Sequence, residues 1–143
     1  MNQFRDFTYD NKSFANLPQL INETKTNDDL HWAVILDPAI EAIKTQDYPV
    51  FMDGYNSDVF IKWDKSVPKE QRYNPPNVPS DRDVVYGKVW PKGPAAFPDF
   101  FKNVTQEWWQ KWISYLHNKL DIKFDALWIV CIIYTVLYNL LLN

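Results

Sequence analysis

Two positions of this chain stand where catalytic side chains would be expected, because each directly follows a short apolar run. Asp37 ends the run from Trp32 to Leu36 in the stretch LHWAVILDPAI. Val130 ends the run in the stretch KFDALWIV. In folds of parallel strands covered by helices, the reacting groups lie at the C-terminal ends of the strands. The first position thus offers a carboxyl group, whereas the second offers only an aliphatic side chain.

Aromatic side chains are unusually abundant, since seven Trp, eight Tyr and nine Phe make up 17% of the chain. Aromatic faces pack against the C–H faces of sugars, whose hydroxyls need polar partners nearby. Most of these rings are expected to belong to the core. Rings outside the core, with Trp63 and Trp90 as candidates, would suit a carbohydrate ligand.

The charge pattern and the cysteine content exclude several classes of function. The net charge is −3 and the Lys and Arg residues are scattered, so we expect no nucleic-acid partner. Cys131 is the single cysteine, which excludes an internal disulfide and a cysteine zinc site. His31 and His117 lie far apart in the sequence. We therefore expect neither a metal ion nor a cofactor.

Three N-x-S/T sequons, at Asn11, Asn22 and Asn103, favour a protein made in the secretory route, where they would be glycosylated. The opening stretch MNQFRDFTYD is polar and acidic, whereas a signal peptide is basic and then apolar. We therefore expect that this chain has no signal peptide of its own.

Two helices are predicted from apolar residues at helical spacing. The first runs from Phe14 to about Thr26, with Ser13 as its N-cap and Pro18 in its first turn. Its apolar face consists of Phe14, Leu17, Leu20 and Ile21. The second covers residues 103–120 and is capped by Asn103 or Thr105. Its apolar face consists of Trp108, Trp109, Trp112, Ile113, Leu116 and Leu120.

The order of the elements predicts an α/β fold. The two apolar runs, at residues 32–36 and 123–129, suit strands that are buried on both faces. Between them, residues 43–99 hold all three glycines and most of the ten prolines, with a short strand expected in DVFIKW. The many aromatics in this region argue for an ordered insertion. Helix, strand, long loop, helix and strand is the order of β/α units around a parallel sheet.

Six stretches in this order closely resemble the catalytic domain of glycoside hydrolase family 31. They are ILDPAI, YPVF, DVFIKW, GKVWP, AFPDFFKNVTQEWW and KFDALWI. The resemblance implies a partial (β/α)8 TIM barrel, incomplete, with about two strands and two helices plus an insertion subdomain. It further implies a division into a barrel fragment at residues 1–129, with the insertion at 43–99, and a divergent apolar tail at 130–143.

The resemblance also implies which residues would contact a substrate and which are missing. Family members are retaining α-glucosidases, whose nucleophile is the Asp of WIDMNE, where this chain has Val130 in WIVCII. The family's acid/base Asp lies beyond residue 143. Ile40, Trp90 and Trp128 match positions that line the subsite for the terminal glucose. Asp37 and Asp99 match motif aspartates that we assign to loop architecture.

The apolar tail at residues 130–143 allows three interpretations. The stretch from Ala126 to Leu142 contains 17 residues without a charge, close to the shortest length that crosses a bilayer. It could instead be a core segment of a small domain of another kind. The third interpretation, which the motifs favour, is that the coding sequence departs from the family at Val130. The run VCIIYTVLY then has the composition of an aggregation-prone strand.

The leading hypothesis is a fragment of a retaining α-glucosidase that hydrolyses terminal α-linked glucose from maltose-type oligosaccharides. The chain alone is expected to be inactive, because Val130 occupies the nucleophile position and the acid/base is absent. One alternative is a non-catalytic carbohydrate-binding remnant. The other is a tail-anchored membrane protein that acts through interactions.

Overall fold

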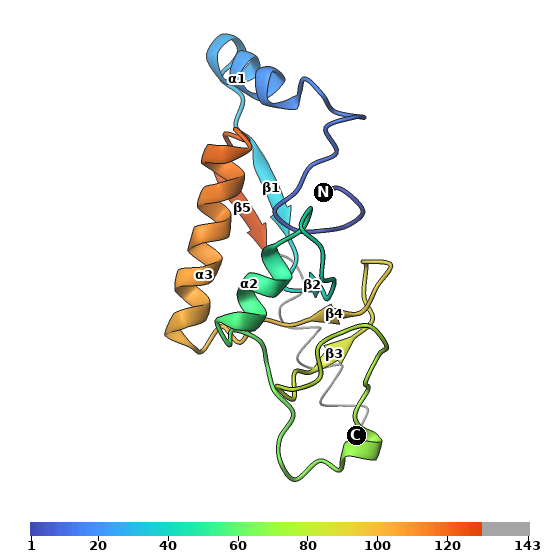
Figure 1. Ribbon diagram of the computed structural model, residues 1–143. Coiled ribbons are helices and arrows are strands. Elements are labelled where there is room, and N and C mark those ends of the chain that lie inside the picture. The colour runs from blue at the N-terminus through green and yellow to red at the C-terminus, as the bar shows by residue number, and fades with distance from the viewer. Residues whose placement is uncertain (130–143) are drawn as a thin grey trace.

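The computed structural model describes residues 1–129. Its helices are α1 (Leu17–Asp28), α2 (Val50–Asn56) and α3 (Asn103–Ser114). Its strands are β1 (Ala33–Leu36), β2 (Ile40–Glu41), β3 (Tyr86–Gly87), β4 (Ala95–Ala96) and β5 (Ala126–Ile129). A 3-10 turn forms at Lys69–Gln71, and a π-helical turn at Tyr115–Lys119 continues α3. Figure 1 shows α3 beside the pair of β1 and β5, with β2, β3 and β4 beyond the end of β1.

The strands β1 and β5 pair in parallel, as the sequence predicts, with Ala33 opposite Ala126 and Leu36 opposite Ile129. The Asp125 carboxylate fixes the start of this pair, because it accepts the Trp32 N–H at 2.9 Å and forms an ion pair with Lys25 of α1. Among residues 1–129 these two strands form one sheet and no closed barrel.

These strands suit burial on both faces in a whole parallel sheet, but residues 1–129 cover only one face of the pair. Ile35 and Trp128 face each other in the register and are 42% and 59% exposed. Leu36, on the opposite face of β1, is buried in the main core, where Leu127 also packs. Successive side chains of a strand point to opposite faces. One face of the pair therefore packs on the core, while the residues that the structure describes leave the other face open.

Helix α3 presents the predicted apolar face to the core, with Trp108, Trp109, Trp112 and Leu116 buried. Neither predicted cap is correct, because Lys102 is the N-cap residue and makes no side-chain capping bond. Asn103 is the first helical residue. Thr105 lies in the first turn, fully buried, and its hydroxyl donates to the Val59 carbonyl at 3.1 Å. The Thr105 side chain, which the sequence pattern predicts as a cap of α3, thus binds the 43–99 region instead.

Helix α1 starts three residues later than predicted. Asn16 is its N-cap, and Pro18 lies in the first turn as expected. The Ser13 hydroxyl, the predicted cap, instead donates to the Asp10 carboxylate at 2.7 Å. Within the helix only Ile21 is buried. The predicted apolar face is therefore only partly covered by the described part of the chain, with Phe14 60% and Leu20 47% exposed.

Residues 43–99 are ordered by their own packing. Helix α2, which the sequence did not predict, buries Phe51 against the stacked ring of Phe60 at 5.5 Å between centroids. The strand expected in DVFIKW is instead a pair of isolated bridges, Phe60 to Pro98 and Lys62 to Val84. Three two-residue strands form an antiparallel sheet in the order β2-β4-β3.

An aromatic cluster joins these parts into one core. The Phe7 ring contacts the rings of Trp108, Trp109 and Trp112, with the shortest centroid distance, 5.0 Å, to Trp109. Trp108 in turn meets Phe60 edge to face at 5.9 Å. The cluster therefore links the N-terminal segment, α3 and the 43–99 region.

No helix within residues 1–129 is long and apolar enough to cross a membrane. The membrane-anchor hypothesis depends on the tail at 130–143, which lies outside the described residues.

Gly54 allows α2 to approach its neighbours closely, and this predicts an unusual effect of substitution. Replacing Gly by Ala inside a helix normally stabilises by up to about 1 kcal/mol. A Cβ at Gly54 would lie 2.9 Å from both the Phe60 ring and the Val59 side chain, which are buried and cannot move aside. We expect Gly54→Ala to lower the free energy of unfolding by about 1 to 3 kcal/mol, measured by urea denaturation.

The control for this experiment is Asn56→Ala, at an exposed position of the same helix, which should change stability by less than about 0.5 kcal/mol. A Gly54→Ala variant as stable as the parent chain would show that the helix can shift away from Phe60.

Candidate functional site

The chain turns sharply at the C-terminal end of β1. Asp37 follows the strand directly, and Ile40 begins β2, so three residues lead from one sheet to the other. The Asp37 N–H donates to the Asp6 carboxylate at 3.0 Å. The N-terminal segment is thereby tied to the strand end at which a parallel fold places its chemistry.

The Asp6 carboxyl is fully buried, and burial raises its pKa well above the ordinary value of 3.8. The bond from the Asp37 N–H opposes this rise, while the charge of Asp37 adds to it. Burial also raises the pKa of Asp37. Because Asp6 is covered, it holds the strand end in place and does not reach a ligand. Its Oδ2 has no hydrogen-bond partner among the described residues.

A second buried carboxylate, Glu41, lies beside this strand end. It forms an ion pair with Arg5 and accepts the Gly93 N–H at 3.1 Å. The Arg5 guanidinium also lies over the Tyr48 ring, 5.5 Å from its centroid. Burial, together with the charges of Asp6 and Glu41, raises the pKa of the Tyr48 hydroxyl well above its ordinary value. Arg5, Asp6, Glu41 and Tyr48 thus form one polar cluster inside the fold.

The three predicted substrate-binding residues lie on different elements. Ile40 is fully buried at the start of β2, where it pairs with Ala96 of β4. Trp90 is 44% exposed on the loop between β3 and β4, so its loop adjoins the sheet that contains Ile40. Trp128 is 59% exposed on β5, which belongs to the other sheet. Val130, at the predicted nucleophile position, lies outside the described residues.

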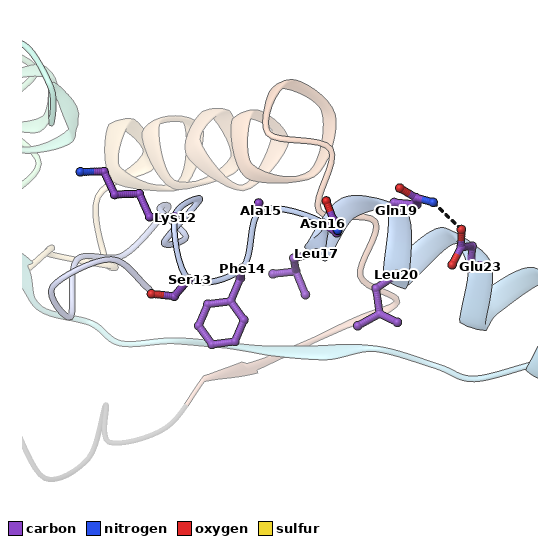
Figure 2. A pocket seen from close by; sticks show the side chains of 9 residues that line it. All are labelled: Lys12, Ser13, Phe14, Ala15, Asn16, Leu17, Gln19, Leu20 and Glu23. Atoms are coloured by element: carbon purple, nitrogen blue, oxygen red, sulfur yellow. Dashed lines mark hydrogen bonds between the residues drawn. The ribbon is translucent and has the colours of Figure 1, made fainter.

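Two cavities of the described chain lie away from the three predicted substrate-binding residues. A groove of about 520 Å³ is lined by the first half of α1 and the segment before it. Phe14, Leu17 and Leu20 lie on one side of it (Figure 2). Its Glu23 carboxylate already accepts a hydrogen bond from Gln19 at 2.6 Å. A second cavity, of about 250 Å³, lies between Tyr48, Trp112 and Tyr115. Neither cavity is lined by Ile40, Trp90 or Trp128.

The remaining candidates from the sequence are placed as follows. The side chains of all three sequon asparagines, Asn11, Asn22 and Asn103, are exposed. Asp99 accepts the Phe101 N–H at 3.2 Å in the turn before α3, which is an architectural role. Within residues 1–129, no three His, Cys, Asp or Glu side chains come together as a metal ion requires.

Sequence reasoning missed the polar cluster, although a signal for it exists. Glu41 stands between Ile40 and Ala42, so it is a single charge between apolar residues. A charge in such surroundings is expected to be buried with a partner. The identity of the partner could not be inferred, because Arg5 and Gly93 are 36 and 52 residues away from Glu41.

Comparison with known proteins finds similarity over almost the whole described chain. A model of the glycosyl hydrolases family 31 TIM-barrel domain matches residues 1–130. Intestinal sucrase-isomaltase of Oryctolagus cuniculus is 35% identical over 87% of this chain. Lysosomal alpha-glucosidase of Mus musculus is 32% identical over 90% of the chain. The chain spans 7% of the length of the first relative and 12% of the second.

A solved structure of the glucosidase II alpha subunit shares the fold. It superimposes on 90% of this chain and 12% of its own, with a TM-score of 0.65 and 22% sequence identity. Probable maltase-glucoamylase 2 of Homo sapiens is a further similar protein, 36% identical over 90% of the chain.

The raised pKa of Asp6 predicts how stability depends on pH. A carboxyl with a higher pKa in the folded state binds its proton more tightly there, so its contribution is fully present below 3.8 and is lost as the pH rises through the raised value. Asp6→Asn keeps an acceptor for the Asp37 N–H and carries no charge at any pH. We expect the variant to be more stable than the parent at neutral pH and equally stable below 3.8, measured by urea denaturation across pH.

Asp10→Asn is the matched control. The Ser13 hydroxyl and the N–H groups of Ser13 and Lys12 lower the pKa of Asp10. Its contribution is therefore present above 3.8 and is lost as the pH falls through the lowered value. Asp10→Asn should thus be less stable than the parent at neutral pH. An Asp6→Asn variant that behaves in the same way would contradict the assignment of Asp6 as a carboxyl destabilised by burial.

Proposed function

Because this chain belongs to glycosyl hydrolase family 31, we propose that it is a segment of the catalytic barrel of a retaining α-glucosidase. The resemblance drawn from the six sequence motifs is confirmed by the family match over residues 1–130. That match is the observation that carries the proposal. The parallel pair of β1 and β5, together with the fold shared with glucosidase II, supports a partial barrel.

The names of the relatives support a substrate class. Sucrase-isomaltase, maltase-glucoamylase and lysosomal alpha-glucosidase are named for the hydrolysis of glucosides. We propose that the whole enzyme takes terminal α-linked glucose from maltose-type oligosaccharides. The names of two relatives, intestinal and lysosomal, support a protein of the secretory route.

The proposed glucose subsite includes Ile40, Trp90 and Trp128. The exposed indoles of Trp90 and Trp128 can each offer a flat apolar face to a sugar ring. Ile40 is covered, so it would support the subsite from behind. Trp63 is a weaker candidate, because its side chain is partly buried and its indole nitrogen is enclosed without a partner among the described residues.

Hydrolysis with retention requires two carboxyl groups about 5 Å apart, one as nucleophile and one as acid/base. We propose that this chain supplies neither, since Val130 occupies the nucleophile position. Asp6 and Asp37 are close together at the end of β1, but the first is fully covered and receives the N–H of the second. The pair is therefore assigned to architecture.

A non-catalytic role in carbohydrate binding is the second candidate function. The observation that favours it is the exposure of Trp90 and Trp128 in a chain whose other tryptophans are buried or partly buried. Such a role requires that the chain itself bind maltose saturably.

We expect the chain to release no glucose from maltose or from 4-nitrophenyl α-D-glucoside, because the two carboxyl groups are absent. Val130→Asp should remain inactive, since one carboxylate cannot act as both nucleophile and acid. Hydrolysis is measured as glucose release, with buffer alone as the control. Binding is measured separately, by titrating maltose and following it with saturation-transfer NMR. Release by the unaltered chain would contradict its inactivity. Saturable binding without release would favour the second candidate function.

The three sequons are expected to be glycosylated when the chain is expressed behind a secretory leader. Asn11, Asn22 and Asn103 are exposed, so attached glycans meet no steric obstacle within the described residues. Endoglycosidase treatment should reduce the apparent mass, and each Asn→Gln variant should remove one step. Since Thr105 of the third sequon is fully buried, modification of Asn103 must precede folding of α3. A chain of unchanged mass after treatment would argue against the secretory route.

A further inference from the structure

Glu41 is a buried carboxylate that directly follows Ile40 of the proposed subsite. It is 5% exposed. A buried carboxylate is strongly destabilising unless it has a positive partner and hydrogen-bond donors. The two partners of Glu41 come from distant parts of the chain, Arg5 at the N-terminal segment and Gly93 before β4.

Arg5 is held from two sides. Its Nε forms the ion pair with Glu41, and both side chains are largely buried, at 16% and 7% exposure. Its guanidinium lies over the Tyr48 ring at 5.5 Å, where a cation is attracted by the ring face. Arg5 therefore neutralises Glu41 at a defined position, and the second carboxylate oxygen remains free to accept another bond.

That second oxygen binds the loop before β4. Glu41 Oε1 accepts the Gly93 N–H at 3.1 Å, and a Cβ at Gly93 would lie 2.9 Å from the same oxygen. Any other residue at position 93 would displace the loop or the carboxylate. The next residues continue the attachment, since the Pro94 carbonyl accepts the Ala42 N–H at 2.7 Å and Ala95 pairs with Glu41 in the sheet.

Trp90 lies in the middle of the loop that this attachment ends. The loop leaves β3 at Gly87 and is fixed again at Gly93. In the described part of the chain, residues 88–92 make no backbone hydrogen bond outside the regular elements. On the β3 side, the Lys88 ammonium lies over the Tyr73 ring at 5.8 Å. Next to Trp90, Pro91 is buried and Val89 packs against the cluster of Ala39, Ala95 and Phe97. The position of Trp90 therefore depends on this packing and on the polar attachment of the loop at Gly93, which Glu41 provides.

We propose that Glu41 is a positioning residue for the glucose subsite, because with Arg5 it attaches the loop that carries Trp90 to the strand that begins with Ile40. Its role in sugar binding rests on the proposed function, whereas its hold on the loop does not. Glu41 acts through Gly93 and does not touch the sugar itself.

The test is native-state cleavage by trypsin after Lys92, which lies between Trp90 and Gly93 and is exposed. Glu41→Ala removes the attachment and should speed this cleavage about tenfold through local opening. Cleavage after the exposed Lys65, in another loop, should keep its rate and serves as the internal reference. Glu41→Gln retains an acceptor for the Gly93 N–H and should stay within about threefold of the parent. Glu107→Ala, at an exposed position of α3, is the matched control.

Maltose extends the test to sugar binding. In the second candidate function, in which the chain itself binds the sugar, maltose should slow cleavage after Lys92 in the parent chain and in Glu41→Gln, but not in Glu41→Ala. An unchanged Lys92 rate in Glu41→Ala, or an equal rise at Lys65, would overturn the positioning role. Should Glu41→Ala fail to fold, Gly93→Ala displaces the loop without removing the charge pair and must speed cleavage after Lys92 alone. Faster cleavage without any effect of maltose would retain the loop attachment and count against the second candidate function, in which the chain alone binds the sugar.

Discussion

The contact of the Phe7 ring with three tryptophans of α3 is the interaction on which the arrangement of this chain depends. Phe7 comes from a segment with little regular structure, and its contact with the three tryptophans packs that segment on the helix. Arg5 and Asp6, the two residues before Phe7, contact Glu41 and the Asp37 N–H near the end of β1. The same tryptophans meet Phe60, so one cluster fixes the N-terminal segment and the 43–99 region together.

Local pattern predicted the elements whose stabilising residues lie close together in sequence. The tryptophan stripe of α3 repeats at helical spacing, and the two apolar runs correctly indicated a parallel strand pair. Helix α2 escaped prediction because Gly54 sits in its middle, where only tertiary contact with Phe60 explains a glycine. The strands β2, β3 and β4 are two residues long and carry no periodicity. Periodicity also shows which face of an element is apolar but not what covers that face, and Ile35 and Phe14 are exposed in the described part of the chain.

In the candidate site, too, the sequence predicts some residues and the folded structure alone shows others. The motifs identify Ile40, Trp90 and Trp128 through family resemblance, and their individual roles stay predictions. The polar cluster of Arg5, Asp6, Glu41 and Tyr48 is seen only in the folded chain. A carboxylate such as Glu41 can be recognised as out of place in an apolar run, but its partners are set by how distant segments meet. The sequence therefore gives the residues that would face a ligand more readily than those that hold them in place.

The parallel pair of β1 and β5 has a consequence for the order in which this chain folds. Trp32 and Asp125, which join at the start of the pair, are 93 residues apart. Closing so long a segment is entropically costly and slow unless the intervening residues have already condensed. We therefore expect the aromatic packing of α2, the short antiparallel sheet and α3 to form before the two strands meet. During synthesis on the ribosome, β1 cannot pair with β5 until nearly the whole described chain has emerged. Until then the backbone N–H and C=O groups of β1 can pair with other strands.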